Sequence, residues 1–317
     1  MKKRYLLIIL IILSVCSLFI GVHSISLADL INGNEDKIYV FMLIRVPRLI
    51  SIIIAGVALS IAGVIMQQIS SNKFVSPTTA ATIDSAKLGV LVATLLFSSA
   101  TIVEKMIISL IFSILGTVIF MKVLDKVKFK NIVFVPLVGI MVGNVIGSIT
   151  DFVAYKYNMV QNMTSFLQGD FSMIIKGKYE LLFLTIPLLI ISFMYAKKFT
   201  IVSMGEEISS NLGISYKKVV QVGVIIVALI SSLVVITVGN IPFIGLIVPN
   251  IVSMFKGDNL SKNIGITAIC GGIFVLVCDM IGRVVIHPYE MPIGTTVGVI
   301  GSGIFLFLIL RRAKNEG

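Results

Sequence analysis

Long apolar runs alternate with short polar segments along almost the whole chain of 317 residues. A helix needs about 20 apolar residues to cross the hydrocarbon core of a bilayer, and most runs are close to that length. The pattern therefore predicts an all-α, polytopic membrane protein that forms a single transmembrane domain over residues 1–317. We expect ten spans, near residues 5–22, 41–66, 88–103, 106–123, 132–153, 180–196, 219–238, 241–255, 264–282 and 293–310.

The first run is also compatible with a signal peptide, because three basic residues, Lys2, Lys3 and Arg4, precede it. The apolar stretch is long, however, and no small-residue cleavage site of the A-x-A type follows it. A retained first helix is the better prediction.

Two segments depart from the simple pattern. The run at 241–255 is short and is interrupted by Pro242 and Pro249, so we expect it in the protein interior near a pathway, where freed backbone groups can be satisfied. Residues 154–178 are polar and aromatic, which predicts an outer loop with a short or half-inserted helix.

Three glycines of the fifth run share one helical face and favour close helix packing: Gly139, Gly143 and Gly147.

Composition and charge support a membrane protein. The chain is 57% hydrophobic and 13% charged, which leaves too little polar surface for a soluble globule. The net charge of +11 could suggest a nucleic-acid partner, but the basic residues fall in short clusters between apolar runs. With ten spans, 18 of the 26 Lys and Arg residues, Lys87 among them, lie on the side of both termini, which predicts cytoplasmic termini and a multi-pass protein of the cell membrane.

Three arginines fall on the outer side, where basic residues are scarce: Arg45, Arg48 and Arg283. They could snorkel to lipid headgroups, or they could serve a partner. Asp279 precedes Arg283 by four residues on the same predicted helix, so that pair can also form a structural salt bridge.

The other acidic residues near the membrane have simple interpretations. Asp84 and Lys87 are three residues apart and can pair on one helix face. Asp151 and Glu290 lie near outer helix ends without an obvious partner in the sequence, so solvation is the default expectation.

No catalytic pattern is present in the sequence. It contains no Walker A glycine loop, no H-E-x-x-H and no G-x-S-x-G, and its two histidines are far apart. We therefore expect no enzymatic activity, no cofactor and no metal site. The energy for any transport must come from an ion gradient or from another subunit.

The stretch 203–218, "SMGEEISSNLGISYKK", is the longest predicted cytoplasmic loop. Glu206 and Glu207 suit the first turn of a short helix because the helix dipole favours acids there, and Gly213 is placed to end it. Leu212 would add to an apolar edge that a partner's groove can bind. A plain surface helix is the alternative.

Several long motifs resemble the iron-siderophore and vitamin B12 family of ABC importer permeases (FecCD type). "RVPRLISIIIAGVALSIAGVIMQQISSNKFVSP" is similar to that family's R-x-P-R, its AG-x-x-L-x-x-AG-x-x-x-Q and its N-x-x-x-x-P. "GNIPFIGLIVPNI", "CDMIGR" and "EMPIG" are similar to its G-x-I-x-F-x-G-L-x-x-P-H, A-D-x-x-x-R and E-x-P-x-G. The resemblance runs over nearly the whole chain.

The resemblance implies the type II importer fold and a set of partners. These are two cytoplasmic ATP-binding cassette ATPases, a second permease copy or homologue, and an extracytoplasmic siderophore-binding protein. It also implies that residues 205–213 form the coupling helix that meets the ATPase, with Gly205 among its residues. On the outer face, it implies that the three arginines dock the acidic lobes of the binding protein through bidentate contacts.

The pathway is expected mainly along the second span, with a partner subunit as the opposite wall. Four residues at helical spacing on one face of that span are the candidates: Gly56, Ser60, Gly63 and Gln67. Packing against a neighbouring helix is the rival explanation for Gly63.

Two departures from the family pattern affect the cargo and the mechanism. Asn250 stands where the family has His, so no role for an imidazole carries over. "SPTTAATIDSAKLG" is similar to the version in permeases for ferric catecholate and related siderophores. We therefore expect a ferric siderophore as cargo, with haem or cobalamin, or a secondary ion-coupled transporter, as alternatives.

Overall fold

The computed structural model describes residues 3–21, 32, 35–77, 81–97, 99–126, 134–174, 177 and 179–316. Over these residues the secondary structure is helical, apart from one isolated bridge between Gln168 and Asn240. The all-α prediction is confirmed. Five basic residues used to predict the topology lie outside the described part: Lys2, Lys128, Lys130, Lys176 and Lys178.

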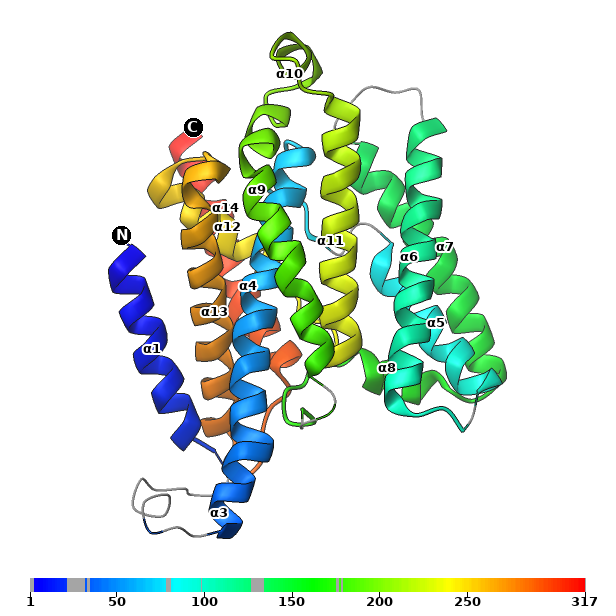
Figure 1. Ribbon diagram of the computed structural model, residues 1–317, viewed down its shortest axis with the longest axis vertical. Helices are drawn as coiled ribbons and strands as arrows, with labels where there is room; N and C mark the ends of the chain where they lie inside the picture. Colours follow the sequence, from blue (N-terminus) through cyan, green and yellow to red (C-terminus); the bar gives the residue numbers. More distant parts are fainter. Residues whose placement is uncertain are drawn as a thin grey trace.

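The helices follow one another along the chain as Figure 1 labels them. In order they are α1 (Lys3–Phe19), α3 (Glu35–Val40), the π-helical turn η1 (Phe41–Arg45), α4 (Val46–Ile69), α5 (Thr82–Leu96), α6 (Ile102–Lys126), α7 (Phe134–Lys156), α8 (Val160–Leu167), the 3-10 turn η3 (Glu180–Leu184), α9 (Thr185–Val202), α10 (Glu206–Asn211), α11 (Tyr216–Val238), α12 (Ile244–Lys256), α13 (Leu260–Val284) and α14 (Ile293–Glu316).

Each of the ten predicted spans overlaps a helix. In the described part, six continuous helices are long and apolar enough to cross a membrane: Glu35–Ile69, Ile102–Leu124, Leu137–Lys156, Glu180–Val202, Tyr216–Val238 and Leu260–Val284. The other four predicted spans correspond to α1, α5, α12 and the apolar part of α14, which are shorter. The prediction of a short helix in the outer loop is also confirmed, since α8 occupies it.

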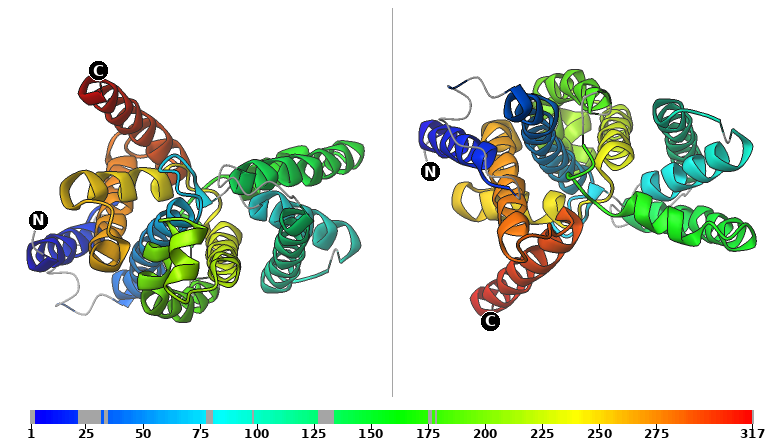
Figure 2. Two further views of the ribbon diagram at one scale, coloured as in Figure 1. Left: turned by 90° about the horizontal axis from the view of Figure 1, so that it is seen from above. Right: turned by 90° about the horizontal axis from the view of Figure 1, so that it is seen from below.

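α4 lies at the centre of the bundle and packs against α9, α11, α12 and α13. Every residue from Ala58 to Gln67 is buried, because small side chains on this helix let its neighbours approach closely. α5, α6 and α7 form a second group that contacts the rest mainly through α11 (Figure 2). The short helix α10 lies at one end of the molecule, and α3 and α8 lie at the other (Figure 1).

Between α4 and α5 the chain runs back into the bundle alongside α12. Lys73 Nζ lies 3.2 Å from Ser253 Oγ near the C-terminal end of α12, whereas Pro77 contacts Gly245 near its N-terminal end. The described residues of this segment are not α-helical, and Pro77 cannot donate a backbone hydrogen bond to a helix. The predicted limits 88–103 are therefore wrong, because part of the crossing is made before α5 begins.

The pairing of Lys87 also differs from the prediction. Its ammonium group forms an ion pair with Asp151 and not with Asp84. Asp151 lies five residues before the C-terminal end of α7, and this end of α7 is the one farther from α10 (Figure 1). Lys87 was assigned to the inner side, and this assignment is wrong because α5 begins inside the bundle. Asp151, predicted to be solvated, has this partner although its side chain remains exposed.

Candidate functional site

The three outer arginines meet at the junction of η1, α4 and α13. Arg48 donates to Asp279 at 2.8 Å and to Glu290 at 2.6 Å, so its guanidinium group bridges two carboxylates. Arg283 pairs with the other oxygen of Asp279, as its spacing predicts, and also donates to the backbone oxygens of Ser17 and Ile20, each at 3.0 Å. Arg45 donates to the Ile20 oxygen as well.

This cluster is buried within the chain. The exposed fractions of Arg45, Arg48 and Arg283 are 8%, 6% and 3%. The arginines therefore hold the end of α1 against α4 and α13, which differs from side chains that snorkel freely to lipid headgroups. The expectation that Glu290 is simply solvated is wrong, because Glu290 forms an ion pair with Arg48. Docking of a partner through these arginines stays a prediction.

The four residues proposed to line a pathway lie in helix contacts. Gly56 packs against the Gly271 backbone of α13, and Gly63 against the Gly245 backbone of α12. Ser60 is fully buried, and Gln67 donates to the backbone oxygens of Gly245 and Leu246 at 3.3 and 3.4 Å. Within this chain, Gly63 has the geometry of the rival explanation, which is close packing, and Gly56 and Ser60 also lie in tight helix contacts. Their exposure to a pathway in an assembled transporter stays a prediction.

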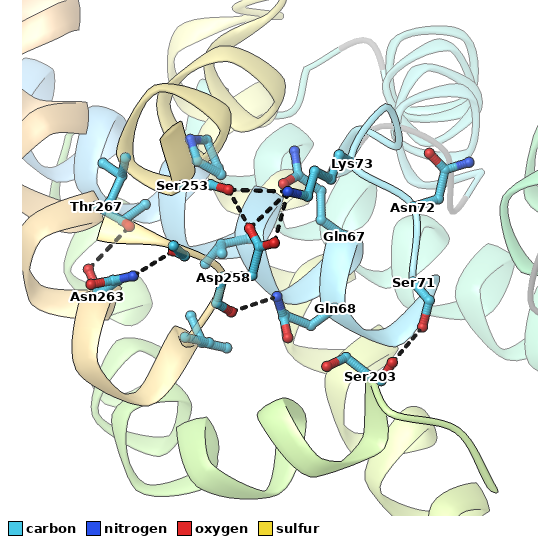
Figure 3. A pocket seen from close by; sticks show the side chains of 15 residues that line it. Gln67, Gln68, Ser71, Asn72, Lys73, Ser203, Ser253, Asp258, Asn263 and Thr267 are labelled. Atoms are coloured by element: carbon cyan, nitrogen blue, oxygen red, sulfur yellow. Dashed lines mark hydrogen bonds and ion pairs between the residues drawn. The ribbon is translucent and has the colours of Figure 1, made fainter. Parts of the chain in front are cut away.

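Gln67 also lines a polar pocket of about 200 Å³ at the end of α4 that is nearer to α10 (Figure 3). Lys73 Nζ lies 2.8 Å from the Asp258 carboxylate and bonds Ser253, so the chain after α4 is tied to the turn between α12 and α13. Both charged side chains are substantially exposed, and pairs of this kind contribute about 0.2–1 kcal/mol. Most residues that line the pocket are polar, and its charged pair is exposed rather than buried.

Asn250 has a clear structural role beside this pocket. Its amide nitrogen donates to the backbone oxygens of Lys73 and Leu246, at 2.8 and 2.7 Å. A carboxamide nitrogen carries two hydrogens and can make both bonds, whereas each ring nitrogen of an imidazole carries at most one. Asn250 thus connects α12, through a hydrogen bond, to the segment between α4 and α5.

α10 lies within the predicted segment 205–213, and its role as a coupling element stays a prediction. It begins with Glu206 and Glu207, and glycines with positive φ flank it, Gly205 at +104° and Gly213 at +74°. An L side chain would be strained at both positions. Leu212 closes the helix and is 60% exposed, so an apolar side chain faces outward at this end of the molecule.

Sequence reasoning missed the residues whose partners are distant in the chain. Lys73, Ser253 and Asp258 were not recognised as a cluster, because no local spacing relates them. Glu290 could have been found, since it belongs to the recognised motif "EMPIG".

The chain is similar to known proteins over nearly its whole length. The chain matches the FecCD transport family over residues 7–311. It is 56% identical over 312 residues to the petrobactin import system permease protein YclN of Bacillus subtilis, covering 98% of this chain and 99% of that protein. It is 39% identical over 298 residues to the ferric-anguibactin transport system permease protein FatD of Vibrio anguillarum, covering 94% and 95%.

A solved structure has the same fold. An inward-facing metal-chelate type ABC transporter superposes with a TM-score of 0.86, at 21% identity and with 98% of both chains covered. Its fold agrees with the order and packing of the helices described above. Because the family match extends from the first helix to the last, the chain belongs to the FecCD transport family.

Proposed function

We propose that this chain is the membrane subunit of an ATP-driven importer for a ferric siderophore, with residues 1–317 as one permease domain. The observation that carries the proposal is the near full-length identity of 56% with a petrobactin import permease. A second relative, with similar coverage, is named as a permease of a ferric-anguibactin transport system. The sequence has no nucleotide-binding loop, so ATP hydrolysis belongs to a separate subunit.

The proposed assembly combines this chain with three kinds of partner. Two ATP-binding cassette ATPases bind the end that carries α10, and a second permease copy or homologue completes the pathway. A siderophore-binding protein docks on the opposite end, where Arg45, Arg48 and Arg283 lie. In this arrangement both termini are in the cytoplasm and the chain is embedded in the cell membrane.

Reconstituted transport tests the function directly. Uptake of an iron-loaded siderophore into proteoliposomes should require ATP, the ATPase subunits and the binding protein. Uptake by the chain alone, abolished by an ionophore, would instead identify a secondary transporter. Supplying haem, cobalamin and ferric catecholates in parallel identifies the cargo class.

The coupling role of α10 gives a specific prediction. Leu212→Asp should reduce ATP-dependent uptake at least about tenfold while the assembled complex still hydrolyses ATP, because a charge would have to lose its hydration in the groove of the ATPase. Uptake and ATP hydrolysis are measured on the same proteoliposomes.

The matched control is Asn211→Asp, which adds the same charge at the neighbouring exposed position of the helix. It should retain at least half of the wild-type uptake. Equal uptake by Leu212→Asp and wild type, in an intact complex, would show that α10 is only a surface helix.

A further inference from the structure

A cavity of about 390 Å³ lies where α5 begins and where α11 passes into α12. It is lined by Ser76, Ile83, Asp84, Asn240, Pro242, Phe243 and Leu246. Its volume is in the range of small-molecule sites, which combine apolar walls with a few polar groups. Among the described residues that line it, Asp84 is the one that carries a charge.

The cavity lies deep in the membrane-spanning part. From Leu246 to the end of α12 at Lys256 the helix rises about 15 Å, at 1.5 Å per residue. Asp84 lies in the first turn of α5, and Leu96 ends that helix about 18 Å further in the other direction. The carboxylate is therefore far from both ends of the bundle.

Close packing places the Asp84 carboxylate beside α7. A β-carbon added to Gly143 would lie 2.6 Å from one carboxylate oxygen, and one added to Gly147 would lie 3.1 Å from the other. The side chain thus fits between α5 and α7 because both positions are glycine. Asp84 is half-buried and is one of the residues that line the cavity.

Asp84 has no ion pair with any described residue. The nearby cation, Lys87, is paired with Asp151 instead. A charged side chain inside a membrane is energetically costly, and such residues typically face a cavity and mark a substrate or ion pathway. The helix dipole also favours an acid in the first turn of α5, so the test below compares two cargoes and does not rely on stability alone.

We propose that Asp84 and Asn240 form a binding site for a protonated amine carried by the transported chelate. An ammonium group offers hydrogen-bond donors and a positive charge, which complement a carboxylate and a carboxamide oxygen. The cavity holds a side arm of a chelate, while Phe243 and Leu246 contact its apolar part. This inference rests on the proposed import function and narrows its substrate class.

The test uses the complete importer in proteoliposomes with two ferric catecholates, one with a protonated amine in its backbone and one with an ether oxygen there. Asp84→Asn keeps the shape that fits against α7 and removes the charge. Uptake of the amine chelate should fall about tenfold, and uptake of the ether chelate by less than about twofold, each relative to wild type.

The control is Glu104→Gln, which removes an exposed carboxylate in the first turn of α6, outside the cavity, and should affect both chelates equally. Equal losses for both chelates in Asp84→Asn, or no loss in either, would overturn the amine site. So would a wild-type importer that transports the ether chelate but not the amine chelate. A wild-type importer that transports no ferric chelate would overturn the proposed function itself.

Discussion

Replacing Arg48 by methionine is expected to destabilise the chain by about 3–5 kcal/mol, the usual cost of removing one partner from a buried ion pair. Arg48 is 6% exposed and bridges Asp279 and Glu290. Without it, Asp279 keeps its ion pair with Arg283, and Glu290 loses its ion pair with Arg48. Thermal denaturation of the purified chain in detergent measures the loss as a lower melting temperature.

Two further variants separate charge from side-chain volume. Arg48→Lys keeps a positive charge but lacks the planar fork that reaches two carboxylates, so its loss should be smaller. Adding Glu290→Gln to Arg48→Met removes one uncompensated acid and should recover part of the melting temperature. If Arg48→Met melts like wild type, the cluster does not stabilise the fold.

The expected loss of stability affects how docking of the binding protein can be tested. The double change Arg45→Glu with Arg48→Glu would place new acids beside Asp279 and Glu290 inside the fold. A loss of docking could then follow from misfolding alone. Docking experiments should therefore include the melting temperature of each variant as a second measurement.

Gly63→Ala is the second change for which we expect a large effect. A β-carbon at this position would lie 2.0 Å from the Gly245 oxygen and 2.3 Å from the Gly245 α-carbon, so α4 and α12 would have to separate. Overpacking of this kind costs about 1–3 kcal/mol, and more where backbone atoms must move. We expect a lower melting temperature together with reduced transport.

Gly298→Ala is the matched control on α14. Apart from its own helical turn, no described residue has an atom within 4 Å of a β-carbon at Gly298, so the same substitution should leave the melting temperature of the chain unchanged. If Gly63→Ala melts like wild type but transports poorly, the packing explanation fails and the pathway prediction for this residue gains support.

The sequence alone determined the elements with strong local signals. Ten apolar runs predicted ten helices, because the number of apolar residues that a helix needs to cross the bilayer can be read from one segment of the sequence alone. Pro242 and Pro249 indicated the short interior helix α12, and Gly213 indicated the end of α10. The pair of Asp279 with Arg283 followed from a spacing of four residues on one helix.

The tertiary structure decided which charges meet and which faces are open. Arg48 pairs with Asp279 and Glu290, which lie 231 and 242 residues away in the sequence. Lys87 pairs with Asp151, 64 residues away, and not with Asp84, which is close to it in the sequence. The segment before α5 lies beside α12, so α5 begins inside the bundle and Asp84 faces a cavity. Helical periodicity determines the face on which a residue lies, but the packing of distant helices determines what that face contacts.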